Sequence, residues 1–224
     1  MISYMAIILG LVMPLEWVAA GKSWIRVRFI TKPLSLILLI FIFSFLGGWV
    51  QPGFWFGAGL LFSLVGDIFL LLRSRFFFAG LFSFLIAHLL YIIGFSFGAL
   101  KLNIWVLLPV LLVVGLVIMA YPRIVGGVRR KLEHKRLWLP VVLYMLTITI
   151  MLLSAMMTWF RDQWTVEAAL LASVGALLFT ISDTLLATVR FLRPVPYGNF
   201  LVMFTYHLGQ IGITAGALMM LGLL

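Results

Sequence analysis

The chain has 224 residues, of which 65% are hydrophobic and only 10% are charged, and its formal net charge is +10. Soluble domains use about 45–50% apolar and about 25% charged residues, so this composition excludes a soluble domain and a disordered segment and requires lipid to cover the apolar surface. Because the chain has no cysteine, disulfides and every cysteine-based nucleophile or metal ligand are also excluded.

Apolar stretches long enough to cross a bilayer, which takes about 20 residues per helix, follow one another along the chain. The eight stretches are 2–20, 34–50, 53–72, 77–98, 103–121, 138–159, 166–189 and 199–223. The first begins without the basic residues of a secretory signal, so we expect an uncleaved helix. The loops are too short for a soluble domain. The sequence therefore predicts an all-α, polytopic membrane protein in which residues 1–224 form one integral membrane domain.

Basic residues gather in alternate loops. The first, third, fifth and seventh loops hold 4, 2, 6 and 2 of the 16 Lys and Arg residues, while the second, fourth and sixth hold 0, 1 and 1. Because positively charged loops stay in the cytoplasm, we expect the odd loops there, both termini outside, and the protein in the inner (plasma) membrane of a bacterium. The run Arg129-Arg130-Lys131 fits a lipid-facing loop better than a nucleic-acid patch, so we expect no nucleic-acid partner.

The third and seventh stretches share a spaced pattern. Its members are Gly59, Leu61, Asp67 and Leu70 in one stretch and Gly175, Leu177, Asp183 and Leu186 in the other. A basic turn follows each, and then Gly80 with His88, or Gly198 with Tyr206, at equal spacing. Helices four apart have the same orientation, so the pattern predicts two parallel four-helix repeats. Chance similarity between apolar helices is the alternative.

A few polar side chains lie within the spans, where the bilayer penalises them. Asp67 and Asp183 are the two acidic residues well inside a span, and a carboxylate near a helix centre costs at least about 2.5–3.5 kcal/mol on insertion scales. Both lie roughly 10 Å from the cytoplasmic end, at a rise of 1.5 Å per residue. Polar residues at similar depth are His88, Tyr91, Tyr144, Tyr206, His207 and Gln210. We interpret this shared depth as one buried site.

Other interpretations of these residues remain open. Each aspartate could hydrogen-bond a neighbouring helix and serve packing alone, and His207 fits that role better than a catalytic one. Carboxylates and imidazoles could ligate a metal, but no HExxH pattern or tight histidine pair supports it, so we predict no metal site. The sequence Gly94-Phe95-Ser96-Phe97-Gly98 spells a nucleophile elbow, but in an apolar helix it indicates close packing.

Taken in order, several of these residues resemble the pattern of a known family. The pattern consists of Thr31-Lys32-Pro33, Gly66-Asp67, Gly80-Leu81 with Phe84, His88 and Tyr91, then Tyr144, Ser182-Asp183, and Tyr206 with Gln210. It resembles the YhhN-type lysoplasmalogenase family of eight-helix membrane enzymes. The resemblance runs from the first predicted cytoplasmic loop to the last span and covers most of the chain.

The resemblance implies hydrolysis of the vinyl-ether bond of lysoplasmalogens, which are membrane lysophospholipids, to a fatty aldehyde and a glycerophospho-alcohol. It places Asp67, His88, Tyr91, Tyr144, Asp183, Tyr206 and Gln210 at the site, with Lys32 at its mouth.

The residues present agree with this reaction. Protonation of the β-carbon of a vinyl ether gives an oxocarbenium-like cation, which water attacks before the hemiacetal collapses. The step needs a protonated carboxyl group and a negative group that stabilises the cation and activates water. Burial and mutual repulsion keep one of two adjacent carboxyls protonated, so we predict Asp67 and Asp183 as an acid/base pair in one chamber that opens inward. No cofactor is required, and Lys32 with Arg73 or Arg75 is expected to hold the phosphate.

Two other functional classes remain as alternatives. Parallel repeats and buried carboxylates also suit a small transporter or proton-coupled permease, although no paired Gly or Pro interruption breaks the helices at mid-membrane. In a purely structural or partner-binding membrane protein, Asp67 and Asp183 would affect stability alone.

Overall fold

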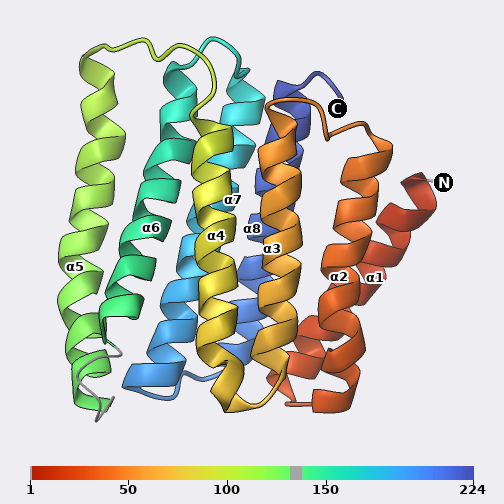
Figure 1. Ribbon diagram of the computed structural model, residues 1–224, viewed down its shortest axis with the longest axis vertical. Coiled ribbons are helices and arrows are strands. Elements are labelled where there is room, and N and C mark those ends of the chain that lie inside the picture. Colours follow the sequence, from red (N-terminus) through yellow and green to blue (C-terminus); the bar gives the residue numbers. More distant parts are fainter. Residues whose placement is uncertain (1, 132–137) are drawn as a thin grey trace.

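The computed structural model describes residues 2–131 and 138–224, which form eight long helices and, within these ranges, no β-strand (Figure 1). The helices are α1 (Ile2–Gly21), α2 (Ile25–Phe45), α3 (Gly53–Leu71), α4 (Phe77–Phe95), α5 (Leu107–Lys131), α6 (Trp138–Met156), α7 (Val166–Ala187) and α8 (Gly198–Met220). Each belongs to a segment long and apolar enough to cross a membrane. Because lipid offers no hydrogen bonds, the backbone satisfies its own polar groups in helices. The predicted all-α, multi-pass membrane architecture is confirmed.

Two helices extend well beyond their predicted spans. Helix α2 begins at Ile25 rather than at 34, and α5 ends at Lys131 rather than at 121. Each continues through a proline at the predicted boundary, Pro33 in α2 and Pro122 in α5. Membrane helices tolerate proline, and long basic side chains at their ends reach the interface, so apolar content marks only the part of a helix inside the hydrocarbon. One consequence is that Lys32 lies within α2.

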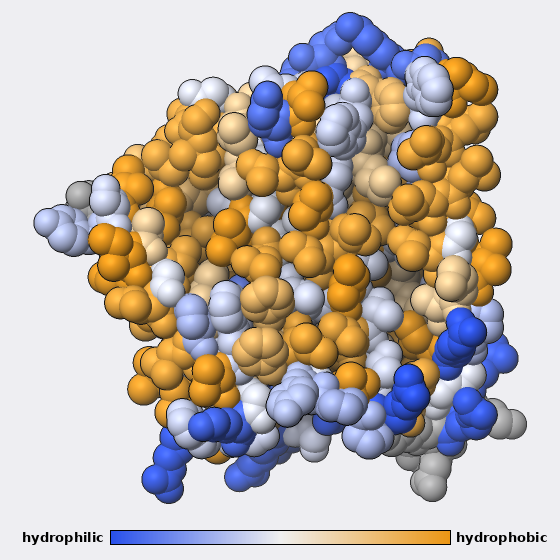
Figure 2. Space-filling model, turned by 180° about the vertical axis from the view of Figure 1, so that it is seen from behind, coloured by the Kyte–Doolittle hydropathy of each residue, from blue (hydrophilic) through white to orange (hydrophobic). Residues whose placement is uncertain are grey.

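The bundle has one basic end. The turns that follow α1, α3 and α7 lie together at the lower end in Figure 1, where α5 also ends, and the other turns and the C-terminus lie at the opposite end. Seen from behind, a broad apolar band separates hydrophilic residues at the two ends (Figure 2). This surface is the one expected of a bundle embedded in a bilayer.

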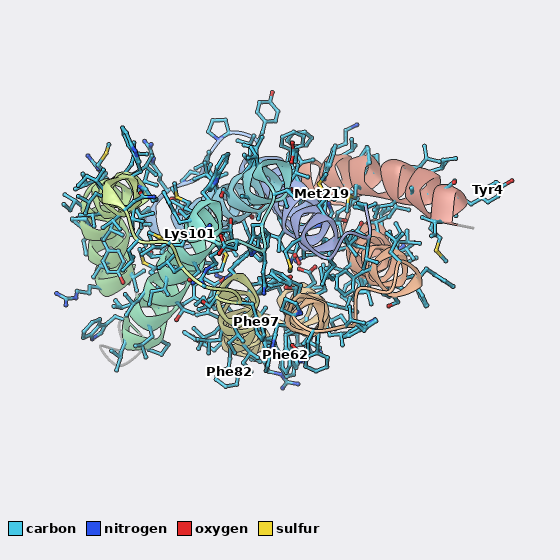
Figure 3. All side chains as sticks on the ribbon, turned by 90° about the horizontal axis from the view of Figure 1, so that it is seen from above. Tyr4, Phe62, Phe82, Phe97, Lys101 and Met219 are labelled. Carbon is cyan, nitrogen blue, oxygen red and sulfur yellow. The ribbon has the colours of Figure 1, made fainter. Side chains whose placement is uncertain are left out.

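Helix α8 lies at the centre, in contact with α1, α2, α3 and α7, whereas α5 is peripheral and packs against α6 and the π-helical segment η4 (Thr188–Leu192). Viewed from above, α1 extends away from the bundle with Tyr4 at its tip, and Phe62 and Phe82 lie on the outer side of α3 and α4 (Figure 3). The buried core takes residues from every helix, and α8 contributes to it from the centre of the bundle.

Small residues bring the two central helix pairs into close contact. A Cβ atom added to Gly175 of α7 would lie 2.5 Å from the backbone nitrogen of Ile213 in α8. A Cβ atom added to Gly66 of α3 would lie 2.6 Å from the ring of Phe84 in α4. Close backbone approach of this kind drives helix association in lipid, where a hydrophobic driving force is missing. The α3–α4 and α7–α8 pairs carry the two intramembrane aspartates.

Candidate active site

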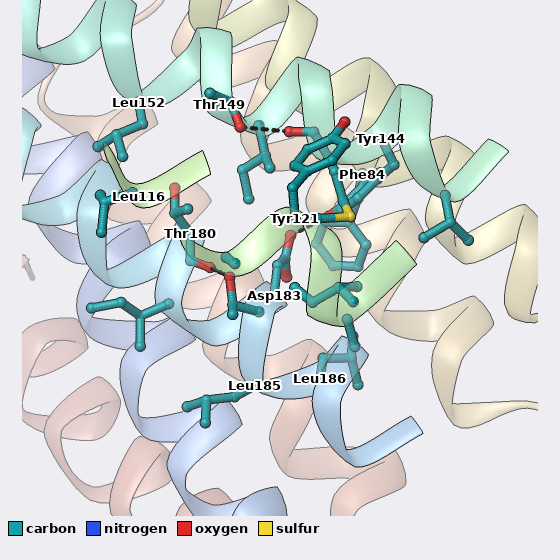
Figure 4. Close-up of a pocket in the computed structure, with 18 of the residues that line it drawn as sticks. Phe84, Leu116, Tyr121, Tyr144, Thr149, Leu152, Thr180, Asp183, Leu185 and Leu186 are labelled. Atoms are coloured by element: carbon teal, nitrogen blue, oxygen red, sulfur yellow. Dashed lines mark hydrogen bonds between the residues drawn. The ribbon is translucent and has the colours of Figure 1, made fainter. Parts of the chain in front are cut away.

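An apolar cavity of about 340 Å³ lies between α4, α5, α6 and α7 (Figure 4). This volume lies in the range of about 300–1,000 Å³ that small-molecule pockets occupy. The wall begins at Phe77 and Phe191 near the basic end. Along α6 it runs from Val141 to Leu152, about 16 Å at 1.5 Å per residue. The shape and lining suit an alkyl chain.

Most polar side chains of this wall are already bonded to the backbone. Three threonines donate to carbonyl oxygens one turn earlier in their own helices; they are Thr149, Thr180 and Thr184. The hydroxyl of Tyr121 donates to a carbonyl oxygen of α6 at 3.0 Å. Asp183 and Tyr144 supply the remaining polar groups of the wall. The Asp183 side chain is 11% exposed, so its carboxylate reaches the cavity.

Asp183, Tyr144 and His88 form a three-residue group, here named the Asp183 cluster. The Tyr144 hydroxyl donates a hydrogen bond to Oδ2 of Asp183. The Nε2 atom of His88 lies 3.1 Å from the same hydroxyl and 3.4 Å from Oδ2 of Asp183. His88 itself is fully buried. Three different helices, α4, α6 and α7, therefore meet at one carboxylate.

The Asp183 cluster can relay a proton without moving its heavy atoms. In one form, protonated Asp183 donates to the Tyr144 oxygen, and the Tyr144 hydroxyl donates to Nε2 of His88. In the other form, Nε2 donates to Tyr144 and the Tyr144 hydroxyl donates to a carboxylate, so that His88 carries the charge. A proton that Asp183 gives away can thus be replaced from His88 through Tyr144.

A second group, here named the Asp67 cluster, is fully enclosed. Lys32 Nζ lies 3.0 Å from Oδ1 of Asp67, and their side chains are 6% and 1% exposed. The Tyr206 hydroxyl donates to Oδ2 of Asp67 at 2.8 Å. Gln210 contacts this hydroxyl at 3.5 Å and accepts a hydrogen bond of 2.8 Å from Tyr91. The eight residues that the family resemblance placed at the site or at its mouth therefore all belong to one of the two clusters.

The expected meeting of the two aspartates in one chamber is not what the structure shows. Within the described residues, no hydrogen bond or ion pair joins the clusters, and Asp67 does not line the cavity. The ring of Phe179 stands between them, 5.2 Å from Tyr206 and 4.8 Å from His88 between ring centroids. Depth along a helix places side chains at one level, but helix rotation decides which of them face each other.

The expected position of Lys32 at the mouth of the site is also wrong. Its ammonium group is buried against Asp67 rather than free at the rim. The physical reason is the extension of α2, which places Lys32 inside the bundle instead of in a loop.

The two clusters use corresponding helices of the predicted repeats. The aspartate of α3 contacts Lys32 of α2 and Tyr206 of α8. The aspartate of α7 contacts Tyr144 of α6 and His88 of α4. Each acid thus takes one partner from its own half and one from the last helix of the other half, which agrees with the predicted correspondence of the halves.

A third buried carboxylate was not predicted from the sequence. Glu16 of α1 has no exposed surface, pairs with Arg28 at 2.9 Å and accepts a hydrogen bond of 2.6 Å from Thr31. Trp17 donates to Nδ1 of His207 at 2.9 Å, and neither residue lines the cavity. Glu16 lies inside the first predicted span. Its burial and its ion pair could have been predicted if α2 had been extended to include Arg28.

Among residues 2–131 and 138–224, no three His, Asp or Glu side chains come together as metal ligands.

Comparison with known proteins places the chain in a family. The model described as the YhhN family matches residues 27–217. Lysoplasmalogenase TMEM86B of Homo sapiens is 32% identical over 204 residues, which cover 91% of this chain and 77% of that protein. Lysoplasmalogenase TMEM86A of Bos taurus is 32% identical over 165 residues, which cover 71% of this chain and 63% of that protein.

A bacterial relative matches over nearly its whole length. The uncharacterized membrane protein YhhN of Escherichia coli O6:H1 is 30% identical over 214 residues, which cover 93% of this chain and 94% of that protein. No solved structure matches the chain. The resemblance carried by the motifs is confirmed, and the chain belongs to the YhhN family.

Proposed function

We propose that this protein is a membrane-embedded hydrolase that cleaves the vinyl-ether bond of lysoplasmalogens to a fatty aldehyde and a glycerophospho-alcohol. The relatives named lysoplasmalogenase align with most of the chain. The observation that carries the proposal is the Asp183 carboxyl group, held by Tyr144 and His88, in the wall of a cavity suited to one alkyl chain. The substrate is then a lipid of the surrounding bilayer.

The proposed reaction begins at Asp183. Its protonated carboxyl group gives a proton to the β-carbon of the vinyl ether, and the resulting oxocarbenium-like cation is stabilised by the new carboxylate. Water attacks the adjacent carbon and loses its proton to Asp183, directly or by way of Tyr144 and His88. The hemiacetal then breaks its bond to the glycerol oxygen, which takes up a proton as the hydroxyl of the hemiacetal releases one. One water molecule is consumed and no net proton.

We assign different roles to the two aspartates. Asp183 is the catalytic residue because it faces the cavity. Asp67 is a positioning residue: it binds the hydroxyl of Tyr206, whose ring packs against Phe179, and Phe179 packs against His88. The acid/base pair predicted from the sequence is replaced, in this proposal, by one acid with a proton relay.

We also propose that the basic end of the bundle faces the cytoplasm of a bacterium, with both termini outside the inner membrane. The basic turns after α1, α3 and α7 and the basic last turn of α5 lie at this end (Figure 1), and positively charged loops are retained in the cytoplasm. The Asp183 cluster would then draw its substrate from the inner leaflet.

Incubation of the purified protein with 1-alkenyl, 1-alkyl and 1-acyl lysophospholipids, followed by mass analysis of the products, tests the proposal. We expect aldehyde from the 1-alkenyl substrate alone. Asp183→Asn should lower this activity by at least about 10²-fold, the smaller limit for loss of general acid–base catalysis.

A matched control is Asp162→Asn, which changes an acid that is 53% exposed and paired with Lys101 outside the spans. This variant should retain the activity. Near-normal turnover by Asp183→Asn, or fatty-acid release from the acyl substrate without aldehyde from the alkenyl one, would contradict the proposal.

A further inference from the structure

One oxygen of the Asp183 carboxyl group is left to the cavity. The hydrogen bond from Tyr144 and the contact with His88 both go to Oδ2. In the part of the chain that the structure describes, no hydrogen bond or ion pair engages Oδ1. The side chain is 11% exposed and lies in the cavity wall. Oδ1 is therefore the oxygen that substrate or water can reach.

Thr180 stands beside this carboxyl group on the same helix. It precedes Asp183 by three residues in α7, and both side chains line the cavity (Figure 4). Residues three apart on a helix are neighbours, with Cβ atoms about 5–6 Å apart, whereas consecutive residues do not face each other. Thr184, the other threonine that α7 contributes to the wall, directly follows Asp183. Thr180 is therefore the better placed of the two to share a ligand with Asp183.

The hydroxyl group of Thr180 can act only as an acceptor toward the cavity. Its proton is already donated to the carbonyl oxygen of Ala176 at 2.9 Å. A hydroxyl group has one proton to donate and two lone pairs that accept, so Oγ1 can still accept a hydrogen bond. The carboxylate form of Asp183 is likewise an acceptor. Two neighbouring acceptors are the partners that a bridging water molecule, with its two protons, requires.

We infer that Thr180 and Oδ1 of Asp183 together bind the water molecule that attacks the substrate, an inference that rests on the proposed function and deepens it. Both protons of this water point to the protein, so a lone pair of its oxygen is free to face the cationic carbon. As the water oxygen bonds to that carbon, one proton passes to Oδ1, and the hydroxyl group of Thr180 keeps its own proton. Thr180 thus orients the water, while Asp183 takes the proton.

Thr180→Val tests this role because valine has nearly the shape of threonine without the hydroxyl group. With a 1-alkenyl lysophospholipid as substrate, we expect kcat to fall by about 10-fold, the rate equivalent of one hydrogen bond, and KM to stay unchanged. Thr180→Ser keeps the hydroxyl group and should retain most of the wild-type kcat.

Turnover in D2O shows which step is affected. Asp183 then places deuterium on the β-carbon, and the cation either reacts with water or returns a proton to Asp183 and becomes a vinyl ether again. In the wild type, attack by the bound water should leave no deuterium in the recovered substrate. In Thr180→Val, slower attack gives the cation time to return, so the recovered substrate should carry deuterium on the β-carbon, measured by mass. A protein that is merely destabilised would lose activity without this exchange.

The matched control is Thr147→Val. Thr147 also donates to a carbonyl oxygen of its own helix, at 2.9 Å, but it lies in α6 outside the cavity wall, so this variant should keep the wild-type kcat and show no exchange. Four results would overturn the inference and leave the proposed function intact: an unchanged kcat in Thr180→Val, a loss of kcat there without exchange, an equal loss in Thr147→Val, or exchange in Thr184→Val instead. If the wild type releases no aldehyde from any 1-alkenyl substrate, the proposed function fails and the inference fails with it.

Discussion

Replacing Asp67 by Asn should destabilise the protein, because it leaves the ammonium group of Lys32 buried without its counter-ion. The two groups lie 3.0 Å apart and their side chains are 6% and 1% exposed. The Asn side chain keeps an oxygen that can accept the hydrogen bond from Tyr206, so the substitution removes charge rather than a hydrogen bond. Breaking one partner of a buried ion pair costs about 3–5 kcal/mol.

The expected loss lies at the lower end of that range. Lys32 occupies the second turn of α2, near the basic end of the bundle, so its flexible stem can turn the ammonium group partly toward the interface. We therefore expect about 3 kcal/mol for Asp67→Asn and a similar loss for Lys32→Met, which leaves the carboxylate unpaired. The double variant should lose less than either single variant, since replacing both members of a buried pair is often close to neutral.

Reversible unfolding of the wild type, the two single variants and the double variant in detergent micelles measures the coupling energy between Lys32 and Asp67. The same cycle on Lys101 and Asp162, a pair whose side chains are 69% and 53% exposed, is the control and should give at most about 1 kcal/mol. Additive losses in the Lys32–Asp67 cycle, or a coupling as small as that of the surface pair, would refute the buried ion pair as the feature that holds the Asp67 cluster together.

Three further substitutions test the cavity and the packing. Tyr144→Phe removes the hydroxyl that links His88 to the Asp183 carboxylate. It should lower turnover, measured as aldehyde release, by about 10²-fold, while unfolding experiments should show that the protein still folds. Leu177→Phe adds volume to the cavity wall and should shift the ratio of kcat/KM values toward shorter alkenyl chains; an unchanged ratio would show that the chain lies elsewhere. Gly175→Ala should destabilise by about 1–3 kcal/mol through overpacking against the α8 backbone, whereas Gly115→Ala, which meets nothing within 4 Å, should not.

The helices were predictable from sequence because each one satisfies its own backbone hydrogen bonds, so its position follows from local apolar content. Residues beyond the hydrocarbon follow no such rule. The start of α2 was therefore placed too late, and Arg28 and Lys32 were assigned to a loop although both lie within the helix. That single boundary hid the partner of Glu16 and the partner of Asp67.

The site residues were predictable as a set but not in their grouping. Their depth follows from the fixed rise of a helix, and both aspartates are in contact with other polar residues of the predicted set. Their partners depend on the rotation and tilt of each helix, which neighbouring helices determine. The insertion of the Phe179 ring between Tyr206 and His88 is a packing feature that no spacing in the sequence indicates.

The two halves of the molecule place an aspartate at corresponding positions but surround it differently. In the Asp67 cluster, α2 contributes a lysine ammonium group that lies 3.0 Å from a carboxylate oxygen. In the Asp183 cluster, α6 contributes the phenol of Tyr144, whose hydroxyl can donate to a carboxylate or accept from a carboxylic acid. The cavity adjoins the second cluster and not the first. Proton transfer to a lipid is therefore expected at Asp183, while the ion-paired half supports the aromatic side chains against which His88 packs.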